Sequence, residues 1–114
     1  MMKGYDRPQA AAYILKNLQR TSGSDALLPL DQLVEQMIDA DEAYMRQAGI
    51  LDADGNVSTK VFYEDDEAYE FILNTVAGKY PGNPAAALWL ASVVDDYMDH
   101  QQAYLESKGL MDWA

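Results

Sequence analysis

The sequence predicts an all-α protein, a four-helix arrangement built from a duplicated helical hairpin with a pseudo-twofold axis. The main observation is an internal repeat, because residues 28–52 align with residues 88–112 at a constant offset of 60 without a gap. Eight of the 25 aligned pairs are identical, namely Leu28/Leu88, Leu30/Leu90, Val34/Val94, Asp39/Asp99, Ala43/Ala103, Tyr44/Tyr104, Gly49/Gly109 and Asp52/Asp112. A repeat sets the architecture before any chemistry is considered, so we expect the two copies to fold alike.

Apolar spacing and capping residues are the other two observations. Apolar residues recur three and four positions apart, which is the spacing of one helix face. The first helix is expected over residues 7–20, because Asp6 suits an N-cap and Pro8 suits the first turn. Its apolar face comprises Ala11, Ile14, Leu15 and Leu18.

The second helix is expected over residues 30–48. Gly49 is the expected residue after its end, and Ile50 is expected to fold back onto the helix in a Schellman-type arrangement. The apolar face comprises Leu30, Leu33, Val34, Met37, Ile38, Tyr44, Met45 and Ala48.

The third and fourth helices repeat this plan. A helix over residues 65–79 is expected, with acids in its first turn and Lys79 at its end, as the helix dipole favours. Asn83 is the expected cap of the longest helix, which begins at Pro84 and continues to Lys108. The shorter helices also match each other, at an offset of 58, through Tyr13-Ile14-Leu15 and Phe71-Ile72-Leu73.

The segment between the two copies has the only strand character in the chain. Residues 52–56 read as a turn, and residues 57–63 are rich in β-branched and aromatic side chains. We therefore consider a short β-hairpin within residues 50–64. A single domain over residues 1–114 is expected, with repeat 1 at about residues 7–52, a linker at 53–64 and repeat 2 at about 65–112.

Composition limits the classes of function. The chain has no cysteine, which excludes disulfides, thiolate nucleophiles and zinc–thiolate sites. Its net charge of −11 disfavours direct binding to nucleic acid or to a membrane surface. The longest apolar stretch, residues 85–91, is too short to cross a bilayer, and the first residues lack a secretory pattern. We expect a soluble cytoplasmic protein that needs no cofactor.

Each repeat carries one polar residue within its apolar face, Asp41 and its equivalent Gln101. One interpretation is a site near the pseudo-twofold axis built from these two side chains. The favoured interpretation is that both lie at the rim and meet water, because a helical face drifts against a seven-residue repeat and a buried carboxylate is costly.

An acidic constellation suggests a metal site as the alternative. Glu67 and Glu70 share one helix face, and Asp96 and Asp99 share another, so four carboxylates would bind Mg²⁺ or Mn²⁺ if the faces met. This pattern resembles that of the all-α nucleoside-triphosphate pyrophosphatases, although Asp96 stands where that family has Glu. The resemblance implies a metal-dependent nucleotide pyrophosphohydrolase. The competing interpretation is that these carboxylates form a solvated acidic face, as a run of carboxylates on a helix usually does.

The aromatic residues allow two interpretations, a protein interface or an ordinary hydrophobic cluster under the 50–64 loop. Eight tyrosines are many for 114 residues, and aromatic side chains among acids are typical of protein interfaces. The only histidine, His100, lies beside the apolar face and is not expected to be a ligand. The partner-binding candidates are Tyr63, Tyr69, Tyr80, Trp89 and Trp113.

We therefore expect a small acidic module that binds a protein partner or itself, without an assigned specific function. In size and charge it is similar in character to bacterial immunity proteins, antitoxins and phage-encoded inhibitors. A homodimer through Leu88, Trp89 and Trp113 is a further hypothesis. Metal-dependent catalysis remains the alternative.

Overall fold

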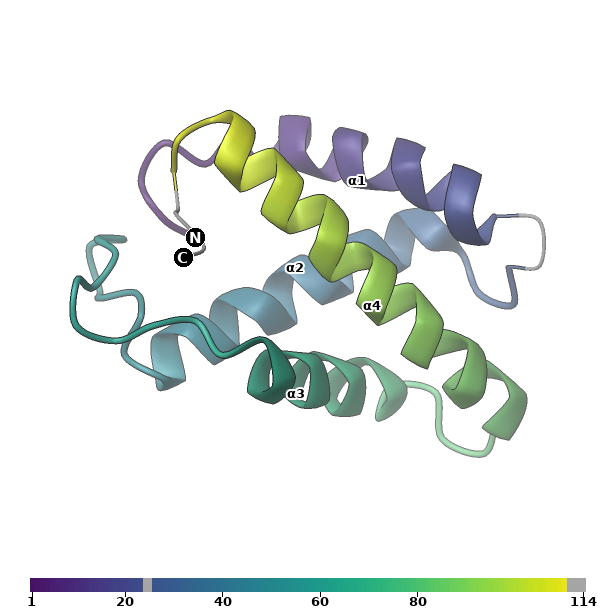
Figure 1. Ribbon diagram of the computed structural model, residues 1–114. Coiled ribbons are helices and arrows are strands. Elements are labelled where there is room, and N and C mark those ends of the chain that lie inside the picture. Colours follow the sequence, from purple (N-terminus) through teal and green to yellow (C-terminus); the bar gives the residue numbers. More distant parts are fainter. Residues whose placement is uncertain (24–25, 111–114) are drawn as a thin grey trace.

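In the computed structural model, four helices follow one another along the chain, α1 (Arg7–Ser22), α2 (Leu30–Gln47), α3 (Asp65–Ala77) and α4 (Pro84–Ser107). The structure describes residues 1–23 and 26–110. α2 and α4 cross between the outer helices α1 and α3 (Figure 1). The prediction of an all-α four-helix arrangement is confirmed, and each helix ends within two residues of its expected limit.

The expected caps determine where two helices begin. The Asp6 side chain accepts a hydrogen bond from the backbone N–H of Gln9 at 3.1 Å, ahead of α1. Asn83 does the same for the N–H of Ala86 at 3.1 Å, ahead of α4. Each cap satisfies one of the N–H groups that a helix leaves without an internal partner.

The core is formed by equivalent positions of the two halves. In α1 and α3 the buried residues are offset by 58, namely Ala10/Ala68, Ile14/Ile72 and Leu18/Val76. In α2 and α4, seven buried pairs are offset by 60, namely Leu30/Leu90, Leu33/Val93, Val34/Val94, Met37/Tyr97, Asp41/Gln101, Tyr44/Tyr104 and Met45/Leu105. Ile38 and Ala40 of α2 and Ala86 of α4 are also buried, without a buried equivalent in the other half. α1 packs on α4 and α2 packs on α3, so each half covers the apolar face of the other.

The two long helices end in the same way. Gly49 and Gly109 adopt φ angles of +80° and +64°, a conformation in which a side chain would be strained. The N–H of Ile50 donates to the carbonyl of Met45 at 2.8 Å, and the N–H of Leu110 donates to the carbonyl of Leu105 at 3.0 Å. These are the backbone bonds of a Schellman-type end, as expected.

The linker differs from the expected β-hairpin. Within residues 1–23 and 26–110 no strand forms, and the segment contains one isolated antiparallel bridge between Leu51 and Val57. The carboxylate of Asp52 accepts hydrogen bonds from the N–H groups of Asp54 and Asn56, both at 2.9 Å. The turn brings Leu51 and Val57 together in this one bridge. Residues 59–62, which follow it, are exposed and extend no strand. In the described part of the chain, no helix has the length and apolar character needed to cross a membrane.

Candidate functional site: an acidic groove between α3 and α4

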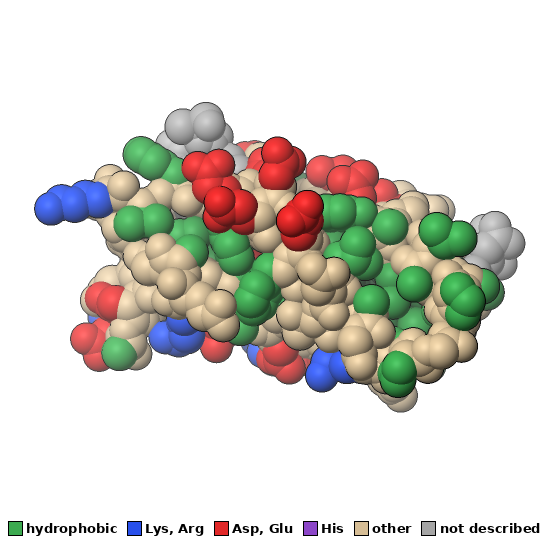
Figure 2. Space-filling model, turned by 90° about the horizontal axis from the view of Figure 1, so that it is seen from below, with side chains coloured by type: hydrophobic (Ala, Val, Ile, Leu, Met, Phe, Trp, Pro, Cys, Tyr) green, Lys and Arg blue, Asp and Glu red, His purple; other side chains and the backbone are tan. Residues whose placement is uncertain are grey.

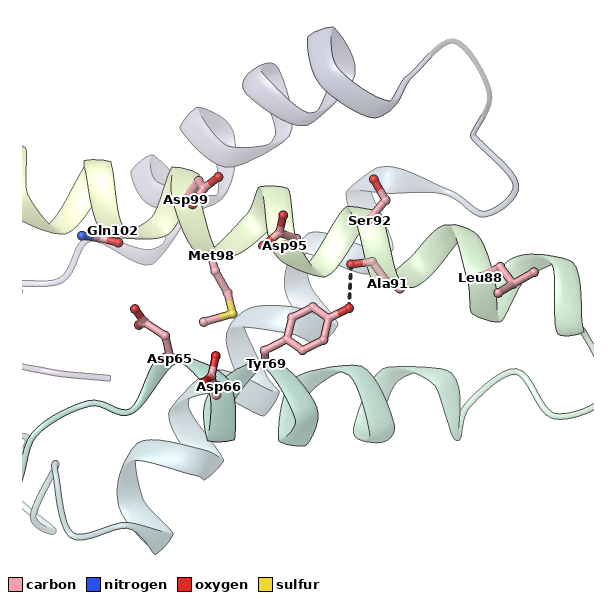
Figure 3. A pocket seen from close by; sticks show the side chains of 10 residues that line it. All are labelled: Asp65, Asp66, Tyr69, Leu88, Ala91, Ser92, Asp95, Met98, Asp99 and Gln102. Carbon is pink, nitrogen blue, oxygen red and sulfur yellow. Dashed lines mark hydrogen bonds between the residues drawn. The ribbon is translucent and has the colours of Figure 1, made fainter.

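A groove of about 580 Å³ separates α3 from α4. Its lining combines acidic side chains with an apolar floor, and none of the lining residues is basic (Figure 3). The acidic residues are Asp65, Asp66, Asp95 and Asp99, the apolar ones are Tyr69, Leu88, Ala91 and Met98, and Ser92 and Gln102 complete the lining.

Helical spacing explains why these residues share one surface. Positions 88, 91, 95, 98 and 102 of α4 follow one another at intervals of three or four, so they form one stripe on that helix. Tyr69 on α3 faces this stripe, and its hydroxyl donates to the carbonyl of Ala91 at 3.2 Å (Figure 3). This bond ties the two helices together at the bottom of the groove.

The surface around the groove is both acidic and apolar. In Figure 2, one group of acidic side chains lies above hydrophobic ones, and other acidic side chains lie beside Lys and Arg along the lower edge of the same face. Leu88 is 80% exposed at one end of the groove. A large apolar side chain beside concentrated negative charge is typical of a surface that binds a partner.

Three of the carboxylates on α4 lie close together. Oxygen atoms of Asp95, Asp96 and Asp99 lie within 4.8 Å of one another. Asp96 accepts a hydrogen bond from the Ser22 hydroxyl of α1 at 2.9 Å. Among the described residues, no Lys, Arg or His forms an ion pair with Asp95 or Asp99.

The acids of the metal hypothesis are divided between two surfaces. Glu67 lines a separate small hollow beside α2, where it accepts a hydrogen bond from the Tyr44 hydroxyl at 3.4 Å. In the described part of the chain, neither Glu67 nor Glu70 belongs to a group of side chains close enough to share one ion. His100 is also outside that group, and its buried Nε2 has no hydrogen-bond partner among the described residues.

The five aromatic candidates for partner binding occupy different places. Tyr69 lines the groove. Tyr80 is half-buried, and its hydroxyl pairs with the side-chain amide of Gln36 at 3.0 Å. Trp89 is half-buried against the main core, and Trp113 lies outside the described residues. Leu88, named only for the homodimer hypothesis, lines the groove beside Tyr69.

Tyr63, the remaining candidate, belongs to a buried polar network. Its hydroxyl donates to Asp41 Oδ1 at 2.7 Å, and the hydroxyl of Tyr97 donates to Asp41 Oδ2 at 2.7 Å. The amide nitrogen of Gln101 donates to the Tyr97 hydroxyl at 3.3 Å, and its oxygen accepts from Tyr5 at 3.0 Å. The network thereby joins the N-terminal segment, α2, the linker and α4.

The favoured placement of Asp41 and Gln101 at the rim is wrong, since each is only 2% exposed. Burial is tolerated because hydroxyl groups from distant segments satisfy the carboxylate. Burial also raises the pKa of Asp41 to about 6, an effect that hydrogen bonds from the two tyrosines oppose. The pKa of Tyr97 is raised well above its ordinary value, first by burial and then by the charge of Asp41. Because Asp41 is buried and each of its oxygens accepts a hydrogen bond from within the protein, we interpret this network as part of the folded core and not as a ligand site.

Several groove residues have no individual signal in the sequence. Asp65, Asp95 and Met98 belong to ordinary helical patterns, and only their common spacing on α3 and α4 places them on one surface.

No family model matches the chain, and neither the curated proteins nor the solved structures contain a match.

Proposed function

We propose that this chain is a non-enzymatic binding module whose α3–α4 groove receives a positively charged, partly apolar segment of a partner protein. The observation that carries the proposal is the composition of the groove. Four carboxylates surround an apolar floor, and no lining residue is basic. A partner segment with basic and apolar side chains would complement both features.

Physical reasoning assigns separate roles to the two kinds of side chain. The net charge of −11 and the acids of the groove attract a basic partner over a distance and orient its approach. Burial of Leu88 and Met98 would then supply much of the binding free energy, since apolar area removed from water contributes about 25 cal/mol per Å². A second copy of this chain is a poor occupant, because two molecules that each carry a net charge of −11 repel each other.

The proposal agrees with the small size, acidity and lack of cysteine of the chain, which suit a cytoplasmic inhibitor or antitoxin-like protein. Such proteins neutralise a partner by covering its surface, and they need no reaction centre. This comparison concerns size and charge and identifies no particular partner.

The test uses a fluorescein-labelled helical peptide that carries leucine on one face and mixed lysine and arginine on the other. We expect anisotropy titrations to show saturable binding that weakens as NaCl increases, because salt screens charges beyond about 10 Å at 0.1 M. Asp99→Asn should weaken binding about tenfold. Asp54→Asn removes the same charge from the exposed linker turn and should change binding less than about twofold. An equal loss of affinity in both variants would show that the peptide is attracted by the net charge alone, and the groove would then be rejected as the binding site.

The alternative is a Mg²⁺- or Mn²⁺-dependent nucleotide pyrophosphohydrolase that uses Glu67, Glu70, Asp96 and Asp99. It would require acids of α3 to join those of α4 around an ion. A bound ion stabilises the folded state, by about 2.7 kcal/mol at 100 times its dissociation constant. The binding proposal predicts an unchanged melting temperature in millimolar Mg²⁺ or Mn²⁺ and no pyrophosphate release from nucleoside triphosphates. A marked rise in melting temperature together with pyrophosphate release would favour the enzyme.

A further inference from the structure

In the first half of the chain, two acids of the long helix α2 bind an arginine of α1. Arg7, the first residue of α1, lies against two acids of α2. Its Nε and Nη2 donate to Glu35 Oε2 at 3.0 and 2.7 Å, and its Nη2 also lies 2.8 Å from Asp39 Oδ1. The same Nη2 donates to the backbone carbonyl of Glu35 at 3.2 Å. One guanidinium therefore bridges two carboxylates one turn apart on the neighbouring helix.

The second half keeps the acids and lacks the arginine. At the offset of 60, Glu35 corresponds to Asp95 and Asp39 corresponds to Asp99. At the offset of 58, Arg7 corresponds to Asp65, which is likewise the first residue of its helix. Because buried positions match at the same two offsets, these pairs occupy equivalent places in the two halves. The α3–α4 groove thus has an acid where the other half has its cation.

The spacing of the α4 acids suits one bridging cation. Arg7 Nη2 is 2.7 Å from one carboxylate and 2.8 Å from the other, so two oxygens bridged in this way lie at most about 5.5 Å apart. Oxygens of Asp95 and Asp99 lie within 4.8 Å of each other. A guanidinium can therefore contact both carboxylates without rearrangement of α4. In Figure 3 the two residues lie along one stretch of α4, above Asp65 and Asp66 of α3.

We propose that the partner presents an arginine whose guanidinium binds between Asp95 and Asp99. This guanidinium would take the place that Arg7 occupies in the other half, and the inference rests on the proposed function. The groove is also more acidic and more aromatic than its counterpart, because Asp65 replaces Arg7 and Tyr69 replaces Ala11. The extra carboxylate attracts the incoming charge, and the Tyr69 ring provides a flat surface for the stem or plane of an arginine.

Arginine is favoured over lysine by the geometry of the Arg7 contacts. Arg7 uses two nitrogens of its planar group to reach Glu35, and one of them also reaches Asp39. A lysine ammonium is a compact, strongly hydrated charge and has no such fork. The arginine proposal therefore predicts discrimination between two side chains of equal charge, which a general acidic surface does not provide.

The first experiment compares three labelled helical peptides with the same leucine face, whose other face carries arginine, lysine or citrulline. We expect the arginine peptide to bind about tenfold more tightly than the lysine peptide, and the citrulline peptide to bind weakest. Asp99→Asn should remove most of the preference for arginine, whereas Asp54→Asn should preserve it.

The outcomes separate this inference from the proposed function. If arginine and lysine peptides bind equally and both are weakened by Asp99→Asn, the groove is a cation-binding surface but the arginine inference is wrong. If neither peptide binds, or if binding is insensitive to Asp99→Asn, both proposals fail.

The second experiment fills the site from within. Asp65→Arg places an arginine where the other half has Arg7, so its guanidinium should occupy Asp95 and Asp99 and exclude the peptide. Glu70→Arg makes the same change of charge on α3 at an exposed position outside the groove lining. We expect Asp65→Arg to weaken the arginine peptide about tenfold more than Glu70→Arg does. Circular dichroism checks that both variants are folded, and equal weakening would overturn the inference.

Discussion

The buried carboxylate of Asp41 makes a measurable prediction about how stability depends on pH. Its pKa is raised to about 6 from an ordinary 3.8, with burial as the largest cause. The folded state therefore holds the Asp41 proton more tightly than the unfolded chain does. The resulting stabilisation is fully present below pH 3.8 and is lost as the pH rises through about 6.

The size of the effect follows from the two pKa values. A difference from 3.8 to about 6 corresponds to about 3 kcal/mol between the protonated and ionised forms. Between pH 5 and pH 8 the part that is lost amounts to about 1.4 kcal/mol. Asp41→Asn removes this titration and keeps the shape of the side chain, whose amide oxygen and nitrogen still reach the hydroxyls of Tyr63 and Tyr97.

The assay is urea unfolding of the wild type and of Asp41→Asn at both pH values. Acids elsewhere titrate in both proteins, so their contribution cancels in the difference between the two free energies of unfolding. We expect the wild type to lose about 1.4 kcal/mol relative to the variant on going from pH 5 to pH 8. Tyr5→Phe is the matched control, because Tyr5 contacts Gln101 and its loss leaves the Tyr63 and Tyr97 donors to Asp41 in place. It should keep the pH dependence of the wild type.

Two results would refute this reasoning. One is a difference in the free energy of unfolding that stays constant between the two pH values. The other is a carboxyl ¹³C resonance of Asp41 that titrates near pH 4 in the folded protein. Either result would mean that solvent or an additional donor compensates the burial of this group.

Further predictions concern the same network, a helix end and the core. Tyr97→Phe removes a donor from buried Asp41, so it should cost about 1–3 kcal/mol in urea unfolding and raise the pKa of Asp41 further in a ¹³C titration. Gly49→Ala should cost about 1 kcal/mol in the same assay, because φ is +80° there, and an unchanged unfolding midpoint would contradict the proposed helix end. Ile72→Ala creates a cavity at a fully buried position and should cost about 2–5 kcal/mol by thermal unfolding.

Local sequence signals were sufficient to predict the helices. The caps at Asp6 and Asn83 and the glycines at 49 and 109 act within a few residues, so their effect can be read without knowledge of the fold. The linker was harder to predict. Its β-branched residues indicated a strand, but pairing after the Asp52 turn is limited to one bridge within residues 1–23 and 26–110.

The polar network and the groove depend on contacts that no local pattern contains. Asp41 can be buried because the hydroxyls of Tyr63 in the linker and Tyr97 on α4 donate hydrogen bonds to it. Both tyrosines lie far from Asp41 in the sequence, so no local pattern predicts these bonds. The ion pair between Arg7 and Glu35 likewise joins two residues that lie 28 positions apart in the sequence. The repeat makes the groove partly predictable from the sequence, because a comparison of equivalent positions shows that Asp65 stands where the first half has Arg7.

The difference between the two halves determines how many partner molecules the proposed site can bind. A symmetric pair of identical hairpins would have the same flank twice, either closed twice by its own arginine or open twice. Among the described residues, Arg7 bridges the acid pair on α2, whereas no Lys, Arg or His forms an ion pair with the equivalent acids of α4, which line the α3–α4 groove. A partner captured there would bind in a one-to-one ratio and would not be cross-linked into larger assemblies.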